Sequence, residues 1–321
     1  MERANKLVTV FGGSGFIGTQ LVQELARRGY RIRVAVRRPD LAGHVRPLGN
    51  VGQIQPIQAN LRNLESVQRA VRGADIVINL VGIRFERGRQ QFRAVQATGA
   101  RYVAEAARLA GAQALVHMSA LGADEQSVSA YARSKALGER EVLAAFPDAV
   151  IIRPSIVFGP GDDFFNMYGS LARLFPVLPL LGGKTRFQPI YIGDLAEAMA
   201  NAAEGQVKTG RVYELGGPEI VTHRQVVERV LHETMRANPL LPLPAWFGKL
   251  IAAPMAILPF APLITADQVD LLQTDNVVSD RAIAEKRDLS AFRVTPTPMQ
   301  AILPSYLWRF RRNGQFDRQP A

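Results

Sequence analysis

Val-Thr-Val-Phe-Gly-Gly-Ser-Gly-Phe-Ile-Gly, residues 8–18, is the stretch that decides the fold of this chain. A strand pattern runs directly into glycines at positions 12, 15 and 18, and a helical pattern follows over residues 19–28. Gly12 allows a sharp turn after the strand, Gly15 lets a pyrophosphate approach the backbone, and Gly18 lets the helix pack tightly on the sheet. The first amides of the helix and its positive dipole end favour phosphate.

This stretch therefore predicts a dinucleotide site. Its members are Gly12, Gly13, Ser14, Gly15, Phe16, Ile17 and Gly18. The alternative is a tight strand–helix turn with no ligand.

The next strand-like run, residues 31–36, ends at Arg37 and Arg38. In dinucleotide-binding folds an acidic residue at this position binds a free ribose 2′-hydroxyl, whereas an arginine accommodates a 2′-phosphate. No carboxylate occurs here before Asp40, so we expect NADPH to be favoured over NADH. The alternative is a pair of surface arginines with no ligand in a basic chain.

The composition is that of a globular protein, with 47% hydrophobic and 21% charged residues among 321, and a net charge of +11. This charge favours anionic partners, but the arginines are dispersed and no nucleic-acid module is evident, so we expect no nucleic acid. Cysteine is absent, which excludes disulfides and Cys-ligated metals. The four histidines show no metal-ligand spacing, and we expect no metal site. They are His44, His117, His223 and His232.

Strand-like and helical runs alternate after the glycine turn, which indicates an α/β Rossmann fold with a doubly wound parallel sheet. The strand-like runs cover residues 53–58, 75–81, 114–118 and 149–154, and the helical runs cover residues 64–71, 90–110 and 129–146. Beyond residue 158 the pattern becomes irregular and rich in proline. We expect a dinucleotide-binding domain over residues 1–235, with C-terminal elements woven in from about residue 160. A smaller, apolar, proline-rich and helical docking region should cover residues 236–321.

Several motifs follow in order, and together the chain resembles an atypical or extended short-chain dehydrogenase/reductase over roughly residues 7–235. These motifs are Asn60-Leu61, Asn79-Leu80-Val81-Gly82, Ser119, Tyr131-Ala-Arg-Ser-Lys135 and Arg153-Pro154-Ser155-Ile156-Val157-Phe158-Gly159-Pro160. The resemblance implies that Asn60 and Leu61 lie beside the adenine, where the family usually has Asp-Leu. It places Val81 and Gly82 near the cofactor, and Pro154 and Ile156 at the nicotinamide.

Tyr131 and Lys135 lie four residues apart, so they share one face of a helix. A lysine ammonium near the phenol favours the phenolate and lowers the pKa of the tyrosine from its usual value of about 10. Tyr131 is then a candidate general acid or base, Lys135 a ligand of the nicotinamide ribose, and Ser119 an orienting group for the substrate oxygen. The alternative is an ordinary helix with an exposed pair.

Two features argue against independent turnover. Only a short run of small and polar residues separates Ser119 from Tyr131, where extended family members often insert a substrate loop. Beyond about residue 164 the chain offers few polar groups to fix a substrate.

The segment 239–264 has Lys249 as its only charged residue and contains six prolines. So many prolines are incompatible with a membrane-spanning helix. Trp246-Phe-Gly-Lys-Leu-Ile251 and residues 255–258 suit short helices on a membrane surface or a hydrophobic partner, or else a cap on the protein's own core. The C-terminal run Tyr306-Leu-Trp-Arg-Phe-Arg-Arg312 also suits an interface.

These features narrow the resemblance to the NAD(P)H-binding accessory subunit family of respiratory complex I, in its bacterial form. The likeness is carried by residues 11–18 with Arg37 and Arg38, and by residues 153–166, 188–194, 213–218 and 306–310. That family implies a tightly bound NADPH outside the electron path. It also implies contacts with other complex I subunits near the quinone site and with the membrane surface.

The leading hypothesis is an NADPH-holding accessory subunit that supports the assembly and stability of complex I. The first strand begins close to Met1, which leaves no room for a presequence, so we expect a peripheral protein on the cytoplasmic side of a bacterial inner membrane, or on the matrix side if organellar. A free-standing NADP-dependent reductase or epimerase is the main alternative, and a sensor of the NADP⁺/NADPH ratio is a weaker one.

Overall fold

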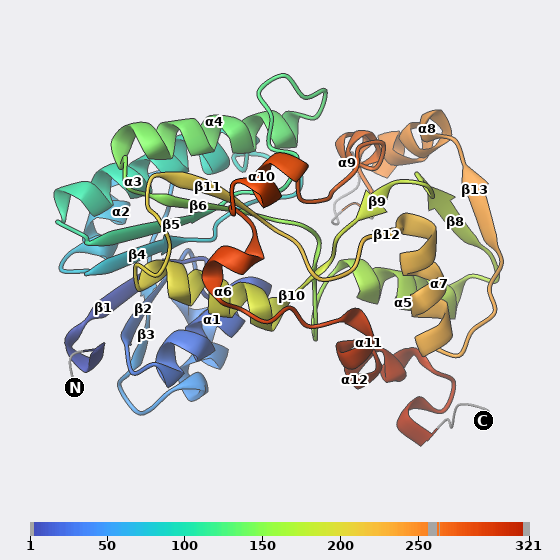
Figure 1. The fold of residues 1–321 in the computed structure, drawn as a ribbon, viewed down its shortest axis with the longest axis horizontal. Helices are drawn as coiled ribbons and strands as arrows, with labels where there is room; N and C mark the ends of the chain where they lie inside the picture. Colours follow the sequence, from blue (N-terminus) through green and yellow to red (C-terminus); the bar gives the residue numbers. More distant parts are fainter. Residues whose placement is uncertain (1–2, 256–261, 263, 317–321) are drawn as a thin grey trace. The chain divides into compact units, whose positions relative to one another are not determined.

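The computed structural model describes residues 3–255, 262 and 264–316 (Figure 1). The chain forms two compact units, and each is assembled from three stretches of sequence. The first unit comprises Met1–Pro154, Ile192–Leu215 and Ser279–Thr295; the second comprises Ser155–Tyr191, Gly216–Val278 and Pro296–Ala321. The boundary expected near residue 235 falls inside the second unit.

The first unit is built on a seven-stranded sheet with the order β11-β6-β5-β4-β1-β2-β3, in which every neighbouring pair is parallel. Its strands are β1 (Leu7–Phe11), β2 (Arg31–Val36), β3 (Ile54–Gln58), β4 (Ile76–Asn79), β5 (Ala114–Met118), β6 (Val150–Pro154) and β11 (Arg211–Leu215). The order reverses on either side of β1, as in a doubly wound sheet. The Rossmann arrangement predicted from the sequence is confirmed.

Helices cover both faces of this sheet, which is why its central strands consist almost entirely of buried residues. One face carries α2 (Leu64–Val71), η3 (Arg93–Thr98), α3 (Gly99–Leu109) and α4 (Ala130–Ala145). The other carries α1 (Phe16–Arg27) and α6 (Ile192–Ala203), which pack on each other. Shorter elements complete the unit: η1 (Arg3–Asn5), η2 (Pro39–Leu48), α10 (Asp280–Ala284) and η4 (Leu289–Phe292).

Two helices differ by more than one residue from their predicted bounds. The first begins at Phe16, three residues before the expected start, because the glycine turn leads directly into it. The helix expected over residues 90–110 begins instead as the π-helical turn η3 and becomes α-helical only at Gly99. A π-helical turn widens the backbone locally and is often found at functional sites.

The second unit contains the region that looked irregular in sequence. Its helical elements are α5 (Phe164–Leu174), α7 (His223–Glu233), α8 (Ala245–Met255), α9 (Ala266–Leu271), α11 (Met299–Ile302), α12 (Pro304–Leu307), η5 (Trp308–Phe310) and η6 (Gly314–Phe316). Its strands form three pairs: β7 (Val157–Phe158) with β10 (Ile190–Tyr191), β9 (Arg186–Phe187) with β12 (Val221–Thr222), and β8 (Leu178–Leu181) with β13 (Leu240–Leu243).

The core of the second unit draws on distant parts of the chain. Phe165 of α5, Val227 of α7 and Leu303 near the C-terminus belong to one buried cluster. The C-terminal aromatic run is divided: Tyr306 and Phe310 are buried in this core, whereas the side chain of Trp308 is exposed.

The segment read as a docking surface is described only in part, since residues 256–261 and 263 lie outside the described residues. Trp246 and Leu250 of α8 are 67% and 62% exposed, and Leu241 of β13 is 52% exposed. Lys249 pairs with Asp270 at 2.6 Å. In the described part of the chain, no helix is long and apolar enough to cross a membrane.

Candidate functional site

The glycine turn has the geometry that its sequence requires. Gly12 leaves β1 with a φ of 78°, which L side chains rarely adopt. Its amide donates to the carbonyl of Ala35 at 3.2 Å, and the amide of Gly15 donates back to Gly12 at 3.1 Å. A Cβ on Gly18 would lie 2.3 Å from the oxygen of Gly12 and 2.6 Å from the Cα of Gly13, so only glycine fits at position 18.

Gly15 is different, because its space is open. A Cβ there would meet only the oxygen of Gly12, at 3.4 Å, and Gly15 is exposed. It is the N-cap of α1, which has no side-chain cap and no acidic residue in its first turn. The start of α1 therefore keeps its partial positive charge available for an anion.

The two arginines after β2 are exposed. Arg38 pairs with Asp40 at 3.5 Å, and both side chains are about two-thirds exposed, so this pair constrains Arg38 only weakly. Within the described part of the chain, the side chain of Arg37 forms no hydrogen bond or ion pair. Arg37 and Arg38 are thus available to a phosphate, and their cofactor role stays a prediction.

His44 is a residue that the sequence analysis missed. It lies in η2, and its Nε2 is 3.2 Å from the carbonyl oxygen of Ser14 in the glycine turn. An exposed imidazole therefore borders the turn and the arginines that follow β2. Only the fold reveals this contact, because thirty residues separate the two partners.

Asn60 and Leu61 follow β3, as expected. The side-chain oxygen of Asn60 accepts a hydrogen bond from the backbone amide of Arg62 at 3.1 Å. The backbone amide of Asn60 donates to Ser66 Oγ at 3.1 Å. Asn60 therefore holds the turn after β3, and its oxygen already has an internal partner. Leu61 is buried.

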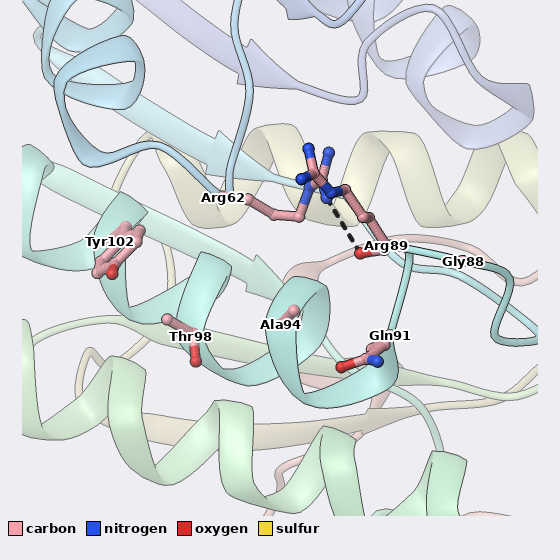
Figure 2. A pocket seen from close by; sticks show the side chains of 7 residues that line it. All are labelled: Arg62, Gly88, Arg89, Gln91, Ala94, Thr98 and Tyr102. Carbon is pink, nitrogen blue, oxygen red and sulfur yellow. Dashed lines mark hydrogen bonds between the residues drawn. The ribbon is translucent and has the colours of Figure 1, made fainter.

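A cavity of about 340 Å³ opens beside this turn. Figure 2 shows the residues that line it: Arg62, Gly88, Arg89, Gln91, Ala94, Thr98 and Tyr102. The guanidinium of Arg62 donates to the carbonyl oxygen of Arg89 at 3.1 Å, the bond drawn as a dashed line in Figure 2. Because Arg62 directly follows Leu61, this basic cavity adjoins the positions expected beside the adenine. The sequence analysis did not single out Arg62 or Arg89.

Val81 and Gly82, after β4, approach the glycine turn and the lysine respectively. A Cβ on Gly12 would lie 3.3 Å from Val81 Cγ2, and a Cβ on Gly82 would lie 3.2 Å from the Nζ of Lys135. The backbone after β4 thus joins the glycine turn to Lys135, and the cofactor roles of Val81 and Gly82 stay predictions.

A buried polar pair, Asn79 and His117, lies next to the backbone that follows β4. Asn79 accepts from the amide of Val81 at 3.1 Å, and its Nδ2 lies 3.1 Å from Nδ1 of His117. The amide nitrogen can only donate, so Nδ1 of His117 accepts. Burial, and secondarily the charge of Lys135, lower the pKa of His117 to about 3. The imidazole is therefore neutral, and the proton on its Nε2 has no acceptor among the described residues.

Ser119, Tyr131 and Lys135 are all present in the first unit. Ser119 is buried at the end of β5, and its hydroxyl has no partner in the described chain. Tyr131 is half-buried in the first turn of α4, with Lys135 Nζ 5.9 Å from its ring centre. Lys135 is buried and donates to the carbonyl oxygen of Met118 at 3.2 Å. Burial lowers the pKa of Lys135 to about 8, although the charge of Glu139 opposes the shift.

Gln96, on the π-helical turn η3, is a further member that the sequence analysis did not identify. Its Nε2 donates to Ser134 Oγ at 3.0 Å, while its buried Oε1 has no donor among the described residues. A Cβ on Gly82 would lie 3.4 Å from this oxygen. Gln96 thus lies at the same end of the site as Lys135.

Pro154 and Ile156, the last two predicted site residues, belong to different units. Pro154 ends β6, and its oxygen accepts from the amide of Leu121 at 3.0 Å. Ile156 belongs to the second unit, where its oxygen accepts from the amide of Ile190 at 2.9 Å. The cofactor roles of Pro154 in the first unit and Ile156 in the second both stay predictions.

These observations fit a dinucleotide cofactor. The chain offers an uncapped helix start above an open glycine, exposed guanidiniums after β2, and a buried hydroxyl and a buried amide oxygen without partners at the far end. Buried polar atoms without partners are rare and call for an explanation such as a ligand. Among the described residues, no group of three histidine, aspartate and glutamate side chains is arranged to hold a metal ion.

Comparison with known proteins agrees with this geometry. Residues 8–216 match the NAD dependent epimerase/dehydratase family. The chain is 34% identical over 313 residues to NADH dehydrogenase [ubiquinone] 1 alpha subcomplex subunit 9, mitochondrial, of Mus musculus, covering 95% of this chain and 80% of that protein. It is 38% identical over 193 residues to the ceramide reductase of Caulobacter vibrioides, covering 60% of this chain and 59% of that protein.

The fold is also found among solved structures. The Thermus thermophilus UDP-glucose 4-epimerase in complex with NAD superposes with a TM-score of 0.69 at 22% identity, over 95% of this chain and 99% of that one. The chain belongs to the NAD dependent epimerase/dehydratase family and, within it, to the group that contains NADH dehydrogenase [ubiquinone] 1 alpha subcomplex subunit 9.

Proposed function

We propose that this protein is an NADPH-binding accessory subunit of respiratory complex I, the NADH:quinone oxidoreductase, and that it supports assembly and stability near the quinone site. The observation that carries the proposal is the match to subunit 9 relatives along 95% of the chain, which runs through both units rather than through the nucleotide fold alone. Other complex I subunits are then its partners, and it is a peripheral protein on the cytoplasmic side of the bacterial inner membrane, or on the matrix side if it is organellar.

The residues proposed to hold the cofactor follow from their positions. The glycine turn and the start of α1 face the pyrophosphate, Arg37 and Arg38 face the 2′-phosphate, and Lys135 faces the nicotinamide ribose. NADPH supplies a hydride when an enzyme of this family uses it. Here its proposed contribution is stability, because a ligand that binds only the folded state adds about 2.7 kcal/mol at a hundredfold excess over Kd.

The preference for NADPH is tested with the arginines. Arg37→Ala together with Arg38→Ala should weaken NADPH binding about tenfold to a hundredfold, the usual loss of one or two hydrogen bonds to a charged group. NADH affinity should hardly change. Arg72→Ala, which removes an exposed arginine elsewhere in the unit, is the matched control. Equal losses for NADPH and NADH would contradict the proposed 2′-phosphate contact.

The assembly role is tested by isolating the tagged chain from its native membranes. Quinone-reducing subunits should come with it, and deletion of the gene should lower the amount of assembled complex. Isolation of the chain without any of these subunits would contradict the proposal.

A free-standing NADP-dependent reductase remains the second candidate, since Ser119, Tyr131 and Lys135 are all in place and a ceramide reductase is among the relatives. Tyr131 would then protonate or deprotonate the substrate oxygen, and Tyr131→Phe would abolish turnover. If Tyr131→Phe leaves complex I assembly and growth unchanged while the arginine variants lower both, the structural role is favoured.

A further inference from the structure

A basic pocket of about 390 Å³ lies in the second unit, between the end of α5 and the chain that follows α7. Arg173, Arg236 and Arg312 line it, and no carboxylate does so among the described residues. These arginines come from the last turn of α5, from the segment between α7 and β13, and from the segment after η5. The fold therefore gathers three guanidiniums that are far apart in sequence.

The walls of the pocket are fixed by hydrogen bonds. Asn238 Nδ2 donates to the carbonyl oxygens of Ala172 at 3.1 Å and Phe175 at 2.6 Å, which ties the segment after α7 to the end of α5. Met235 has a φ of 54°, so the chain turns sharply as α7 ends. Arg236 Nε donates to the carbonyl oxygen of Phe310 at 3.0 Å. The pocket is thus part of the folded unit rather than a chance gap between long side chains.

No carboxylate among the described residues pairs with the three arginines of this pocket. The side chains of Arg173 and Arg312 make no hydrogen bond or ion pair with any described residue, and the side chain of Arg236 bonds only a carbonyl oxygen among them, that of Phe310. Burial, with the charges of Arg312 and Arg173, lowers the pKa of Arg236, as expected when like charges face one another. An anion bound in the pocket would relieve this repulsion between the arginines. A guanidinium binds a phosphate group through two parallel N–H···O hydrogen bonds.

Apolar side chains border the same pocket. Leu174 and Phe175 line it, yet they are 68% and 51% exposed. Elsewhere on this unit, Leu241, Trp246 and Leu250 are more than half exposed. A ligand with a phosphate group alone would leave this apolar surface in water, whereas a lipid has both a phosphate and an acyl chain to offer.

We propose that the pocket of Arg173, Arg236 and Arg312 binds the phosphate headgroup of an anionic phospholipid, with Leu174 and Phe175 against the glycerol and the start of the acyl chains. This deepens the membrane contact of the proposed function by giving it a site and a lipid class. It needs no other subunit, so it is measured on the purified full-length chain.

The experiment is flotation with phosphatidylcholine vesicles in which about one lipid in five is phosphatidylglycerol, against vesicles of phosphatidylcholine alone. The unaltered chain should float with the anionic vesicles only. Arg173→Gln with Arg312→Gln should lower the partition coefficient about 25-fold, from about 1 kcal/mol for each basic residue near an anionic surface. Neither side chain has a described partner, so the fold should be retained, which a thermal melt checks.

Two controls separate a site from diffuse attraction. Arg72→Gln removes one exposed positive charge from the first unit, half of what the double variant removes, and should change the partition coefficient by less than about twofold. Phe175→Ser leaves the charge intact and should weaken vesicle binding while leaving the binding of inorganic phosphate unchanged. Equal losses for Arg72→Gln and the double variant would overturn the proposal.

Competition identifies the source of the phosphate. Inorganic phosphate, compared with chloride at the same ionic strength, should displace little of the vesicle-bound protein. Complete displacement would show a free-phosphate site, and tighter binding of a phosphoserine peptide than of the vesicles would show a protein partner; either result would overturn the lipid assignment. Failure of the tagged chain to bring down complex I subunits would leave this result untouched, so the two proposals fail separately.

Discussion

At the scale of single residues, Gly15 and Gly18 separate the folding role of the glycine turn from its binding role. A Cβ at Gly18 meets backbone atoms at 2.3 and 2.6 Å, so Gly18→Ala must push α1 away from the turn. We expect a loss of about 3 kcal/mol or more in the free energy of unfolding, the upper end of the cost of overpacking. Gly15→Ala meets only one atom at 3.4 Å and should fold normally, but its methyl group projects toward the proposed pyrophosphate and should weaken NADPH binding at least about tenfold.

Urea denaturation and NADPH titration of both variants test this pair. Gly43→Ala is the control for glycine loss, since nothing lies within 4 Å of a Cβ there, and it should change neither quantity. A Gly15→Ala variant that binds NADPH normally would contradict the proposal that the pyrophosphate lies against this turn.

Lys135 predicts a pH dependence of stability. Its pKa is about 8 in the folded chain and 10.5 when exposed, so between these values the unfolded chain holds a proton that the folded chain has released. Stability of the nucleotide-free protein relative to Lys135→Met should therefore rise with pH across this window, by about 3 kcal/mol in all and at most about 1.4 kcal/mol per pH unit. Urea denaturation from pH 7 to 10.5 measures the difference.

The methionine variant changes packing as well as charge, but that effect is constant with pH, so only the slope of the difference carries the test. A difference that stays flat up to pH 10.5 would mean that the ammonium is not desolvated in the folded state. His117, with a pKa of about 3, titrates far below this window and does not interfere.

Gln96 and His44 could not be identified from the sequence, and the physical reason is the same for both. Gln96 lies on the π-helical turn η3, and its carbonyl oxygen would lie only 2.1 Å from a Cβ on Gly138 of α4. This close approach is a tertiary contact that leaves no periodic trace in the sequence. His44 reaches Ser14 through a turn of η2 in the same way. The glycines, Arg37, Tyr131 and Lys135 were identifiable because their roles depend on spacing within one or two elements.

At the scale of elements, the sequence predicts best what is local. The strand expected over residues 114–118 and the helix over residues 64–71 agree with β5 and α2 at both ends. These segments carry clear periodicity and defined ends, as where Asn63 caps α2 by accepting from Ser66 at 2.8 Å. By contrast, β11 was not predicted, because it is a short edge strand whose partner, β6, lies about sixty residues earlier.

One contact joins the C-terminal helices of the second unit to its centre. Tyr306 of α12 donates to Asp162 Oδ2 at 2.6 Å, and Asp162 Oδ1 accepts from the amide of Phe165 at 2.7 Å at the start of α5. Burial raises the pKa of Asp162, and the phenol opposes that shift. Tyr306→Phe leaves a buried carboxylate short of a donor, so we expect a loss of about 1–3 kcal/mol at pH 7.

The cost of Tyr306→Phe should shrink as the pH falls through the raised pKa of Asp162, since the protonated carboxyl has less need of the phenol. Thermal melts of both proteins at several pH values measure this. Tyr191→Phe is the control: this tyrosine is half-buried in the same unit, its hydroxyl makes no hydrogen bond with any described residue, and the cost should stay within about 0.5 kcal/mol. Equal costs for the two variants would show that the Tyr306–Asp162 bond contributes nothing.

At the scale of the whole molecule, each unit is completed by chain that lies far along the sequence. Residues 279–295 belong to the first unit although more than sixty residues of the second unit precede them. The amide of Glu214 in β11 donates to the carbonyl oxygen of Arg287 at 2.8 Å, so this segment covers the outer edge of the sheet. No local pattern predicts that association, so the composition alone predicts a boundary near residue 235, whereas the structure returns residues 279–295 to the first unit.

This arrangement predicts that residues 1–235 will not form a stable nucleotide-binding domain by themselves. The fragment lacks Phe292, which is fully buried, packs edge-on to Tyr213 with ring centres 5.0 Å apart, and accepts a hydrogen bond from Asn201 through its carbonyl oxygen. In the full chain, Phe292→Ala should cost about 3–5 kcal/mol in urea denaturation, as for other buried aromatic residues. Phe316→Ala removes an 82% exposed ring and should cost less than about 0.5 kcal/mol. A 1–235 fragment with the urea midpoint and the NADPH affinity of the full chain would show that residues 279–295 are not needed to cover β11 or to fill the space beside Tyr213.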